Sequence, residues 1–332
     1  MNPQKHQLTL LNDCLLKLQN EPCSFSYLSD VELKFVSQQL ELLIADGVLE
    51  ATEEPNPVYS FVGNVEFLDA STIQSAIERF DCTTHFDVTV HSAISSTNDY
   101  LLEQANEPNI TYVCVAETQT VGRGRRGNKW RSNPYQNIAM SLSMRFATWP
   151  STASAAALVV AVATASVLNE RFSDSVRIKW PNDLMIDGAK LGGILVEAEG
   201  VFGGECQIVA GLGLNINQAD CSLEEQSGYK WASLSEHHDS IDRNNLIAVL
   251  SFAISNSLDI FAKQGFEPFV HAWNELSCYH GQQVKAEMHS GAIIGTQVGV
   301  DDTGALLIRD TSKVLHRITD VTERVRPFNV ND

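Results

Sequence analysis

The sequence predicts an α/β protein in three parts, with a helix-covered sheet in the largest of them. Between about residues 85 and 270, short β-rich runs alternate with stretches of helical spacing, as in a sheet covered by helices. The front of the chain instead shows helices followed by two short strands, and its end shows short strands and turns. A chain of 332 residues, 44% hydrophobic and 19% charged, is long enough for two or three globular domains. We expect domains at 1–70, 85–275 and 278–328.

The first domain has the outline of a winged helix. Apolar residues recur at helical spacing over 8–18 and again over 36–44. Two strand-like runs, 48–50 and 58–62, then flank a turn at 53–57 that contains two prolines. Helices followed by a β-hairpin predict a winged-helix-like domain.

The charge of this domain disagrees with DNA binding. It carries three cations against eleven acids, a net charge of −8, whereas affinity for DNA depends on cations that contact phosphates. The expected hairpin tip carries Glu53 and Glu54, and we expect the second helix to expose Glu32 and Glu41 with only Lys34 to offset them. The domain resembles a DNA-binding domain in its expected secondary structure but not in its charge.

The middle of the chain predicts the sheet and its covering helices. One expected helix is apolar nearly all round, as a helix buried against a sheet would be. The elements expected in order are strands at 111–116 and 138–144, a helix at 153–168, strands at 176–180, 190–197 and 207–217 with a turn at Pro181–Asp183, and a helix at 243–261.

The segment Gly122–Arg131 is the strongest chemical signal in the chain. It places five cations in nine positions of a protein whose net charge is −18, and three glycines allow its backbone to approach a ligand closely. Arginine side chains offer forked donors that match phosphate oxygens. We interpret the segment as a flexible phosphate-binding loop, hereafter the basic loop; a solvated loop or a nucleic-acid patch is the alternative.

The basic loop also spells G-x-G-x-x-G, the pattern of a dinucleotide-binding turn. That turn must lead straight into a helix and be followed about 20 residues later by an acid that binds ribose. Here residues 128–134 are unfavourable as the first turn of a helix, and no acidic residue occurs between Glu117 and Glu170. The pattern therefore does not predict dinucleotide binding.

The sequence also indicates the cellular compartment in which the protein is expected. The N-terminus has no apolar segment of a signal peptide, and we see no apolar stretch that would span a bilayer, so the cytoplasm is expected. Seven cysteines without C-x-x-C spacing indicate reduced, structural thiols, and the pair His237–His238 indicates a surface loop more than a metal site.

Five motifs in a fixed order resemble those of bacterial biotin protein ligases, the bifunctional biotin–[acetyl-CoA-carboxylase] ligase and biotin operon repressor family. The resemblance covers about residues 85–328 well and the front end loosely. The motifs are Ser95-Ser96-Thr97-Asn98, Gln119 with Gly122–Gly127 and Trp130, Lys179-Trp180-Pro181-Asn182-Asp183, Lys190–Glu197, and Gly211–Asn217.

The resemblance implies a fold and a chemistry. The fold would be a class II synthetase-like, mixed-sheet catalytic domain, with an N-terminal winged helix and a C-terminal SH3-like barrel. In this family the carboxylate of biotin attacks the α-phosphate of ATP, with Mg²⁺, to give biotinyl-5′-AMP, and a lysine of an acceptor protein then takes the biotin. The implied partners are the biotin carboxyl carrier protein of acetyl-CoA carboxylase as acceptor, operator DNA, and a second copy in a homodimer, with no membrane.

Carried over by motif, the resemblance assigns candidate residues. Those expected in catalysis are Lys190, Arg123, Arg125 and Asp183. Those expected to bind biotin are Ser96, Thr97, Asn98, Gln119, Arg123, Gly124, Arg125, Lys190, Gly192 and Gly193. Those expected to bind the nucleotide are Arg123, Arg125, Arg126, Trp130, Lys179, Asn182 and Asn215. No protein cluster is expected to hold a metal; Mg²⁺ would arrive with ATP and lie near Asp183.

Ordinary structural roles compete with several of these assignments. Ser95–Asn98 makes a good helix N-cap, Asp183 could hold a turn, and Trp180 suits a core. Two other functions also stay open. A lipoate-protein ligase shares the chemistry but needs no polar pocket for a ureido ring, and a DNA-binding regulator without ligase activity would need a basic face on the first domain.

Overall fold

The computed structural model describes most of the chain. The described residues are 3–45, 47–53, 56–62, 65–80, 84–104, 107–131, 133–147, 155–172, 175–200, 205–217, 230–238, 241–288, 291–319 and 325–328. The chain forms two compact units, of which the first comprises 1–143, 211–219 and 233–248, and the second comprises 144–210, 220–232 and 249–332.

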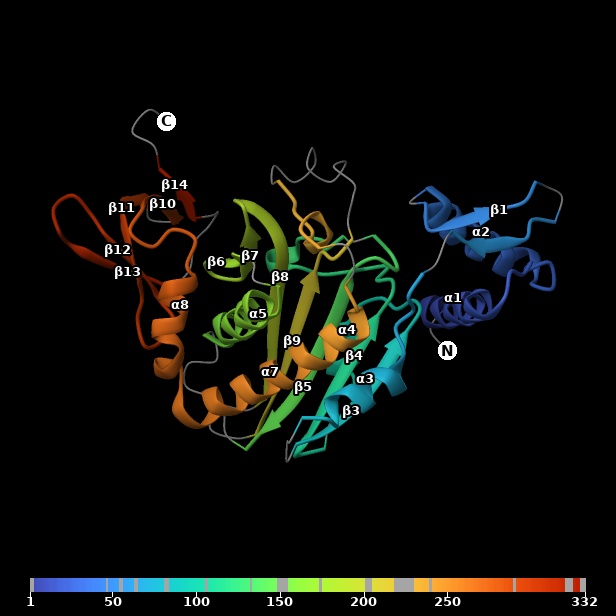
Figure 1. Cartoon of the computed structure of the whole chain (residues 1–332), viewed down its shortest axis with the longest axis horizontal. Coiled ribbons are helices and arrows are strands. Elements are labelled where there is room, and N and C mark those ends of the chain that lie inside the picture. The colour runs from blue at the N-terminus through green and yellow to red at the C-terminus, as the bar shows by residue number, and fades with distance from the viewer. Residues whose placement is uncertain are drawn as a thin grey trace. The chain divides into compact units, whose positions relative to one another are not determined.

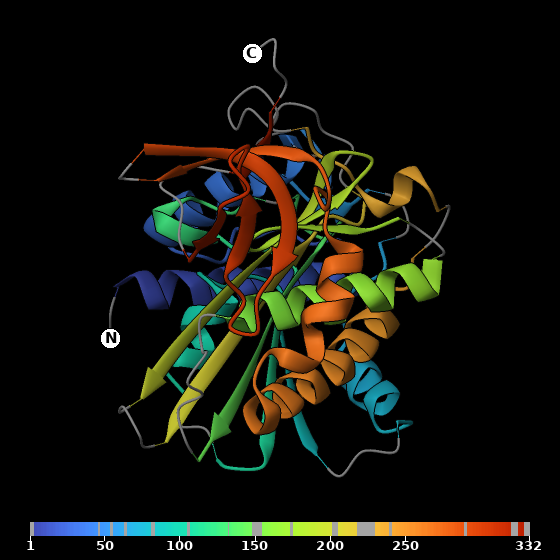
Figure 2. The ribbon, with the colours of Figure 1, turned by 90° about the vertical axis from the view of Figure 1, so that its left-hand side faces the viewer.

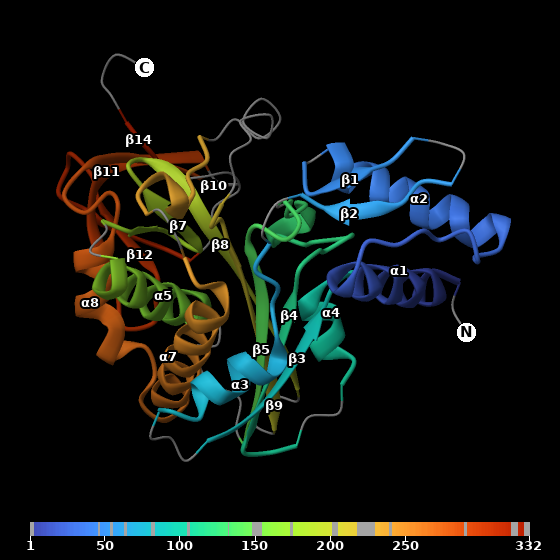
Figure 3. The ribbon, with the colours of Figure 1, turned by 45° about the vertical axis from the view of Figure 1, so that its right-hand side comes forward.

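The two helices and the hairpin expected at the front of the chain are present in the first unit. Helix α1 (Pro3–Asn20) contacts α2 (Asp30–Ala45), and strands β1 (Leu49–Ala51) and β2 (Tyr59–Phe61) pair antiparallel beside them (Figure 3). Their shared core is apolar and buried. It includes Leu11, Leu15, Phe25, Val36, Leu40 and Leu43.

The connection between α1 and α2 departs from a helix-turn-helix. Residues 21–29 contain no helix, whereas that motif joins its helices by a turn of about three or four residues. Both the backbone N–H and the hydroxyl of Ser29 donate to Glu32 Oε2, at 3.0 and 2.6 Å. Glu32 is thus half-buried rather than exposed as expected, because it caps the start of α2; Glu54 lies outside the described residues.

Seven strands form the mixed sheet predicted for the middle of the chain. Strand β3 runs parallel to β4, while the pairs β4–β5, β6–β7 and β7–β8 are antiparallel. In sheet order the strands are β3 (His85–His91), β4 (Ile110–Ala116), β5 (Ile138–Phe146), β9 (Cys206–Leu214), β8 (Ala189–Gly200), β7 (Asp183–Ile186) and β6 (Arg177–Lys179).

Two short helices of the first unit accompany the parallel strands. Helix α3 (Ala70–Ile77) lies along β3, and α4 (Thr97–Leu102) lies along β4 (Figure 1). Each begins at a side-chain cap, Asp69 for α3 and Ser96 for α4, which accepts a hydrogen bond from the first turn. The N-cap expected for Ser96 is therefore confirmed, and it fixes the start of α4 at the first sequence motif.

In the second unit, helix α5 (Ala156–Phe172) contacts β6, β7 and β8. It is buried on nearly all sides, as expected. Helix α7 (Arg243–Gln264), which continues into this unit, is the one described helix long and apolar enough to cross a membrane. Leu250, Ile254 and Leu258 are completely buried, so its apolar side belongs to a core. Helix α8 (Val270–Leu276) contacts α5, and short 3₁₀ turns occur at Leu234–Glu236 and Glu267–Phe269.

The end of the chain forms a second, antiparallel sheet, seen in front in Figure 2. The tryptophan expected in the core, Trp180, is 6% exposed and donates from Nε1 to the carbonyl of Gly304, whose φ of +82° closes the turn after Asp301. In sheet order the strands of this C-terminal sheet are β13 (Leu315–Ile318), β12 (Leu306–Arg309), β11 (Gly291–Val300), β10 (Gln283–Met288) and β14 (Val325–Pro327).

The cysteines are free thiols in the described part of the chain. Cys14, Cys114 and Cys206 are buried, while Cys23 and Cys278 are half-buried. Burial raises the pKa of the Cys278 thiol to about 12, which keeps it protonated and unreactive. These features agree with structural roles; Cys82 and Cys221 lie outside the described residues.

Candidate active site

The first group of predicted site residues is a buried cluster of neutral polar groups at the start of α4. The backbone N–H and the hydroxyl of Thr97 both donate to Gln119 Oε1, at 2.9 and 3.2 Å. Ser96, Thr97 and Asn98 are 2–4% exposed. Uncharged groups held in fixed positions suit a neutral polar ligand, since they recognise it without the cost of burying a charge.

Ser141 completes this cluster and was missed by the sequence analysis. Its Oγ lies 2.7 Å from Thr97 Oγ1 and 2.6 Å from Asn98 Oδ1, and the residue is fully buried on β5. Gly211 on β9 leaves room for Asn98, because a Cβ there would lie 2.2 Å from Asn98 Oδ1. A buried serine on a strand gives no signal of its own, so only the fold brings it to the cluster.

The basic loop closes on itself through backbone hydrogen bonds. The N–H of Trp130 donates to Gly122 O at 2.9 Å, and the N–H of Gly124 donates to Asn128 O at 2.7 Å. A short 3₁₀ turn, Arg125–Gly127, forms its tip, with Arg126 at φ +58°. This positive φ brings the chain back within three residues, so the loop is a compact hairpin rather than an extended segment.

The arginines of the basic loop differ in their surroundings. Arg123 Nη2 lies 2.5 Å from Asp99 Oδ1, on the first turn of α4. Arg125 is half-buried, whereas Arg126 is exposed at the tip. Asp99 thus ties one arginine of the loop to the helix that carries the polar cluster.

Trp130 lies against strand β9. A Cβ on Gly213 would lie 2.3 Å from Cε2 of the Trp130 ring, so the glycine is what allows the ring to rest there. Asn215, just beyond the strand, is fully buried and accepts a backbone hydrogen bond from Leu234. Trp130 and Asn215, two of the residues predicted to bind the nucleotide, are therefore both anchored at the end of β9.

A second group lies in the other unit, on β6, β7 and β8. Lys190 Nζ lies 2.6 Å from Asp183 Oδ1, and their side chains are 15% and 13% exposed. Lys179, 6% exposed, stands opposite Asp183 in the β6–β7 register. One carboxylate thus stands beside two cationic side chains, which leaves net positive charge for an anionic ligand.

Asp183 opens strand β7 and does not close a turn, which corrects the expected Pro181–Asp183 turn by one residue. A bulge between Leu184 and Met185 changes the β7–β8 register, so that Asp183 pairs with Gly193 and Met185 with Lys190. The strand is too short to show a periodic pattern, which is why the sequence did not reveal it.

Lys190 is also held by its backbone and by an aromatic ring. Its N–H donates to Lys230 O, and its carbonyl accepts from Ala232. Its Nζ lies 5.7 Å from the ring centroid of Trp231, within the range of a cation–π contact. Trp231 is a residue that sequence reasoning missed.

Asn182 is engaged with the backbone of β8. Its Nδ2 donates to Ile194 O at 2.8 Å, and Ile194 N donates back to Asn182 O at 3.0 Å. The predicted glycines Gly192 and Gly193 precede this contact, opposite Leu184 and Asp183. Asn182 therefore fixes the turn that places Asp183.

A buried ion pair lies near the first group, at the end of β4. Arg243 Nη1 lies 2.7 Å from Glu117 Oε2, and both side chains are almost fully buried. Glu117 Oε1 also accepts from Leu68 N at 2.7 Å, and Arg243 donates to Asn137 O. Glu117 is two residues from Gln119, so this pair holds the end of β4 in place; it was not predicted.

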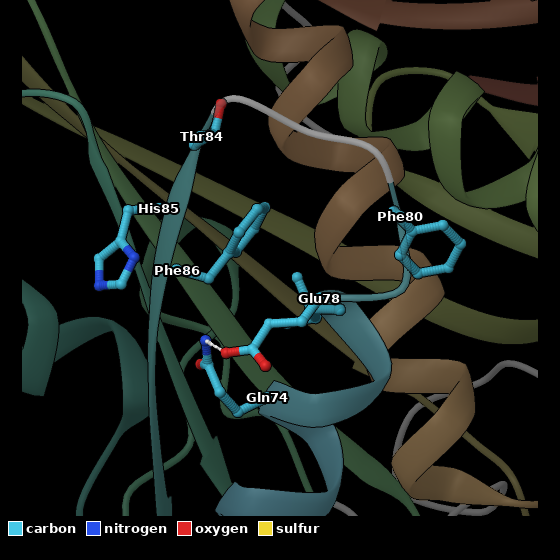
Figure 4. A pocket seen from close by; sticks show the side chains of 7 residues that line it. Gln74, Glu78, Phe80, Thr84, His85 and Phe86 are labelled. Carbon is cyan, nitrogen blue, oxygen red and sulfur yellow. Dashed lines mark hydrogen bonds between the residues drawn. The ribbon is translucent and has the colours of Figure 1, made fainter.

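Within the described residues, no three His, Cys, Asp or Glu side chains gather to hold a metal ion. A surface pocket lies elsewhere in the first unit, between α3 and the start of β3 (Figure 4). It is lined by Phe80, Phe86, His85 and a hydrogen-bonded pair, Gln74 and Glu78. It contains none of the predicted site residues.

Known proteins resemble this chain over both the middle and the end. Residues 90–215 match the biotin/lipoate A/B protein ligase family, and residues 279–319 match the biotin protein ligase C-terminal domain. The bifunctional ligase/repressor BirA of Salmonella typhimurium is 36% identical over 76% of this chain and 77% of that protein. BirA of Escherichia coli is 35% identical over 76% of this chain and 77% of that protein.

A solved structure agrees with these matches. The biotin protein ligase from Aquifex aeolicus in complex with biotin and ATP aligns with a TM-score of 0.62 and 25% identity, over 73% of this chain and 99% of that one. The protein thus belongs to the class of ligases in which a mixed-sheet domain is followed by a small β-domain. The chain belongs to the biotin/lipoate A/B protein ligase family, which confirms the family and the fold class predicted from the motifs.

Proposed function

We propose that this chain is a biotin protein ligase, which activates biotin with ATP to biotinyl-5′-AMP and transfers biotin to a lysine of an acceptor protein. The observation that carries the proposal is that the first unit holds a neutral, buried polar cluster and the second unit holds a cationic group, in a chain 36% identical to a named ligase/repressor. A neutral ring system and an anionic carboxylate are the two ends of biotin. The chain offers one kind of group for each end.

The ureido ring is assigned to the cluster at the start of α4. Ser96, Thr97, Asn98 and Gln119 supply donors and acceptors without formal charge, as a urea carbonyl and its two N–H groups require. For the remainder of biotin we propose contacts at Gly124 in the loop and at Gly192 and Gly193 on β8, since glycine lets a ligand come close to the backbone. We expect the apolar tail to lie on strand faces.

The first chemical step is assigned to Lys190, Arg123 and Arg125. A carboxylate oxygen of biotin attacks the α-phosphorus of ATP, the new O–P bond forms, and the bond to pyrophosphate breaks. The ammonium of Lys190 neutralises charge that develops on the reacting oxygens, while the two arginines hold the phosphates. Asp183 keeps that ammonium oriented through the 2.6 Å ion pair.

In the second step the neutral amine of an acceptor lysine attacks the acyl carbon of the mixed anhydride, the amide bond forms, and AMP leaves. The basic loop keeps water from the anhydride until the acceptor arrives. Acceptor specificity follows from the relatives named biotin–[acetyl-CoA-carboxylase] ligase, so the biotin carboxyl carrier protein is the proposed acceptor.

The nucleotide is assigned to residues at the end of β9 and around the loop. In this proposal Trp130 covers the nucleotide, Asn215 contacts the adenine, and Arg126 and Lys179 contact phosphates. Asn182 acts through the turn that holds Asp183. Mg²⁺ would arrive with ATP and be held mainly by its phosphates, with Asp183 as the nearby carboxylate.

Pyrophosphate exchange tests this proposal. Labelled pyrophosphate should enter ATP when biotin is added, and should not do so with lipoate or without an acid. Exchange with lipoate alone would favour the lipoate ligase alternative. Absence of exchange with either acid would overturn the ligase proposal and would favour a regulator without ligase activity.

Repression of transcription is the second candidate, because two of the relatives are named bifunctional ligase/repressor. The net charge of −8 over residues 1–70 and the connection at 21–29 both oppose it. Binding to operator DNA that survives physiological salt would establish it, and loss of binding there would leave the chain a ligase. We place the protein in the cytoplasm in either case, where both substrates occur.

A further inference from the structure

Tyr135 has a backbone conformation that is strained for a large side chain. The residue lies between the basic loop and strand β5, it is 4% exposed, and its φ is +62°. A left-handed conformation costs free energy in a bulky residue and persists only where the surrounding structure holds that residue. The contacts of Tyr135 must therefore offset this strain.

The ring of Tyr135 packs against two phenylalanines from the front of the chain. Its centroid lies 4.9 Å from that of Phe61, on β2, and 6.1 Å from that of Phe67, with interplanar angles of 68° and 87°. Phe61 and Phe67 are themselves 4.9 Å apart. Edge-to-face pairs at these distances are favourable. The three rings form one cluster, hereafter the aromatic cluster, which joins Tyr135 to the apolar core around α1 and α2.

The backbone of Tyr135 is bound to the end of β4. Its N–H donates to the carbonyl of Glu117 at 3.1 Å, and Gln119 follows two residues later. Gln119 Oε1 accepts the two hydrogen bonds from Thr97 that order the polar cluster. The position of Tyr135 therefore affects a side chain predicted to bind biotin.

The next two residues of the chain are bound to the end of β9. The carbonyl of Gln136 accepts from Asn217 N–H at 3.2 Å. Asn137 Oδ1 accepts from Ile216 N–H at 2.8 Å. Asn215, which is predicted to bind the nucleotide, immediately precedes these two donors. One short segment thus joins the ends of β4 and β9, each of which carries a predicted site residue.

We propose that Tyr135 is a positioning residue of the candidate active site: its ring, held in the aromatic cluster, fixes residues 135–137 and with them the ends of β4 and β9. Tyr135 acts through Gln119 and Asn215 and not by contact with a substrate. Its role in ligation rests on the proposed function. The front of the chain, whose charge opposes DNA binding, thereby holds the site through Phe61.

The kinetics of pyrophosphate exchange test this role. Tyr135→Gly removes the ring, and glycine adopts a φ of +62° without strain, so the turn itself is kept. The KM values for biotin and for ATP should each rise about tenfold, because side chains that contact both substrates lose their fixed positions. We expect kcat to stay within about twofold of the parent, since Lys190 is not involved. Tyr135→Phe keeps the ring and should retain the parent's KM values.

Two further variants separate positioning from stability. Phe61→Leu removes a ring of the aromatic cluster from β2 and should raise both KM values, and its effect should add little to that of Tyr135→Gly. Phe25, 1% exposed, lies in the same apolar core and stacks on Tyr59. Phe25→Leu should lower the melting temperature but leave both KM values unchanged.

Hydrogen exchange without ligands gives a second readout that needs no ligase activity. The amides of Ile216 and Asn217 should exchange at least about tenfold faster in Tyr135→Gly than in the parent, and at the parent's rate in Phe25→Leu. A parent chain without biotin-dependent activity would overturn the proposed function alone, and amide exchange would then decide the positioning role. Unchanged exchange in Tyr135→Gly, unchanged KM values in an active enzyme, or equal KM increases in Phe25→Leu would overturn the proposal.

Discussion

Lys190 and Asp183 form an ion pair between neighbouring antiparallel strands, with Nζ and Oδ1 2.6 Å apart. The bulge after Leu184 sets this pairing, because without it the two residues would not share this register on one face. Each side chain is about one-seventh exposed, so the pair is shielded from water yet open on one side. The orientation of the ammonium therefore depends on Asp183.

Lys190→Ala should lower the rate of adenylation by about 10² to 10³, because the charge that develops in the transition state loses its partner. The variant should stay folded. Lys263→Ala is the matched control, since Lys263 also sits in an ion pair, with Asp259 at 2.5 Å, but is 69% exposed. Single-turnover formation of biotinyl-5′-AMP measures the effect. Near-normal adenylation in Lys190→Ala would show that the assignment is wrong.

Ser141→Ala should weaken biotin binding by about tenfold, because the hydroxyl that orders Thr97 and Asn98 is lost. Ser251→Ala is the control: Ser251 is equally buried, but its Oγ has no hydrogen-bond partner among the described residues. Calorimetric titration with biotin compares the two variants. Equal affinities would remove Ser141 from the site.

Arg243→Met should lower the free energy of unfolding by about 3 to 5 kcal/mol, because it leaves the buried Glu117 carboxylate without its partner. Lys263→Met breaks an exposed pair and should cost less than about 1 kcal/mol. Urea denaturation measures both. A small effect of Arg243→Met would contradict a stabilising role for this ion pair.

Ligand should order the basic loop. Its glycines and like charges favour open states, and phosphate oxygens remove the repulsion between the arginines. Hydrogen exchange over Gly122–Arg131 should therefore slow when biotin and ATP are added, in the parent chain. Gly213→Ala should reduce that protection, because its Cβ would overlap the Trp130 ring. Exchange that is unchanged by ligand would contradict loop closure.

Burial lowers the pKa of His91 below its usual 6.5. The ring packs edge-on against Tyr100, with centroids 4.8 Å apart, and its buried Nε2 has no hydrogen-bond partner within the described part of the chain. The unfolded chain thus binds a proton before the folded protein does. Stability from His91 is complete above about pH 6.5 and is lost as the pH falls through the folded-state pKa.

His91→Phe keeps the aromatic contact and removes this titration. Its melting temperature should fall less than that of the parent as the pH is lowered from about 7.5 to about 5. His271, 85% exposed, offers a control in His271→Phe, whose pH dependence should match the parent. Identical curves for all three proteins would exclude His91 as the titrating group.

The long elements followed from the sequence. Strand β5 was expected at 138–144 and extends to Phe146, and the helix expected at 243–261 runs to Gln264. Their apolar patterns persist over many residues, so local propensity and burial agree. Helices α3 and α8 and strand β7 were not identified, because short elements carry too few residues for a period to show. Strand β3 was also missed, although its apolar residues alternate over as many positions as β4 contains.

The sequence alone determined the family and the chemical character of the site. The glycine-rich arginine loop, Lys190 and the Ser96–Asn98 motif are contiguous runs of reactive or conformationally special residues, and such runs are visible without a fold. The division into domains at 1–70, 85–275 and 278–328 and the roles of the site residues stay predictions.

Only the tertiary structure decided which residues support those motifs. Ser141, Trp231 and the Glu117–Arg243 pair are ordinary residues in the chain, and they acquire meaning through partners 40 to 130 positions away. Contacts between distant residues come from chain topology and packing, which local sequence patterns do not encode.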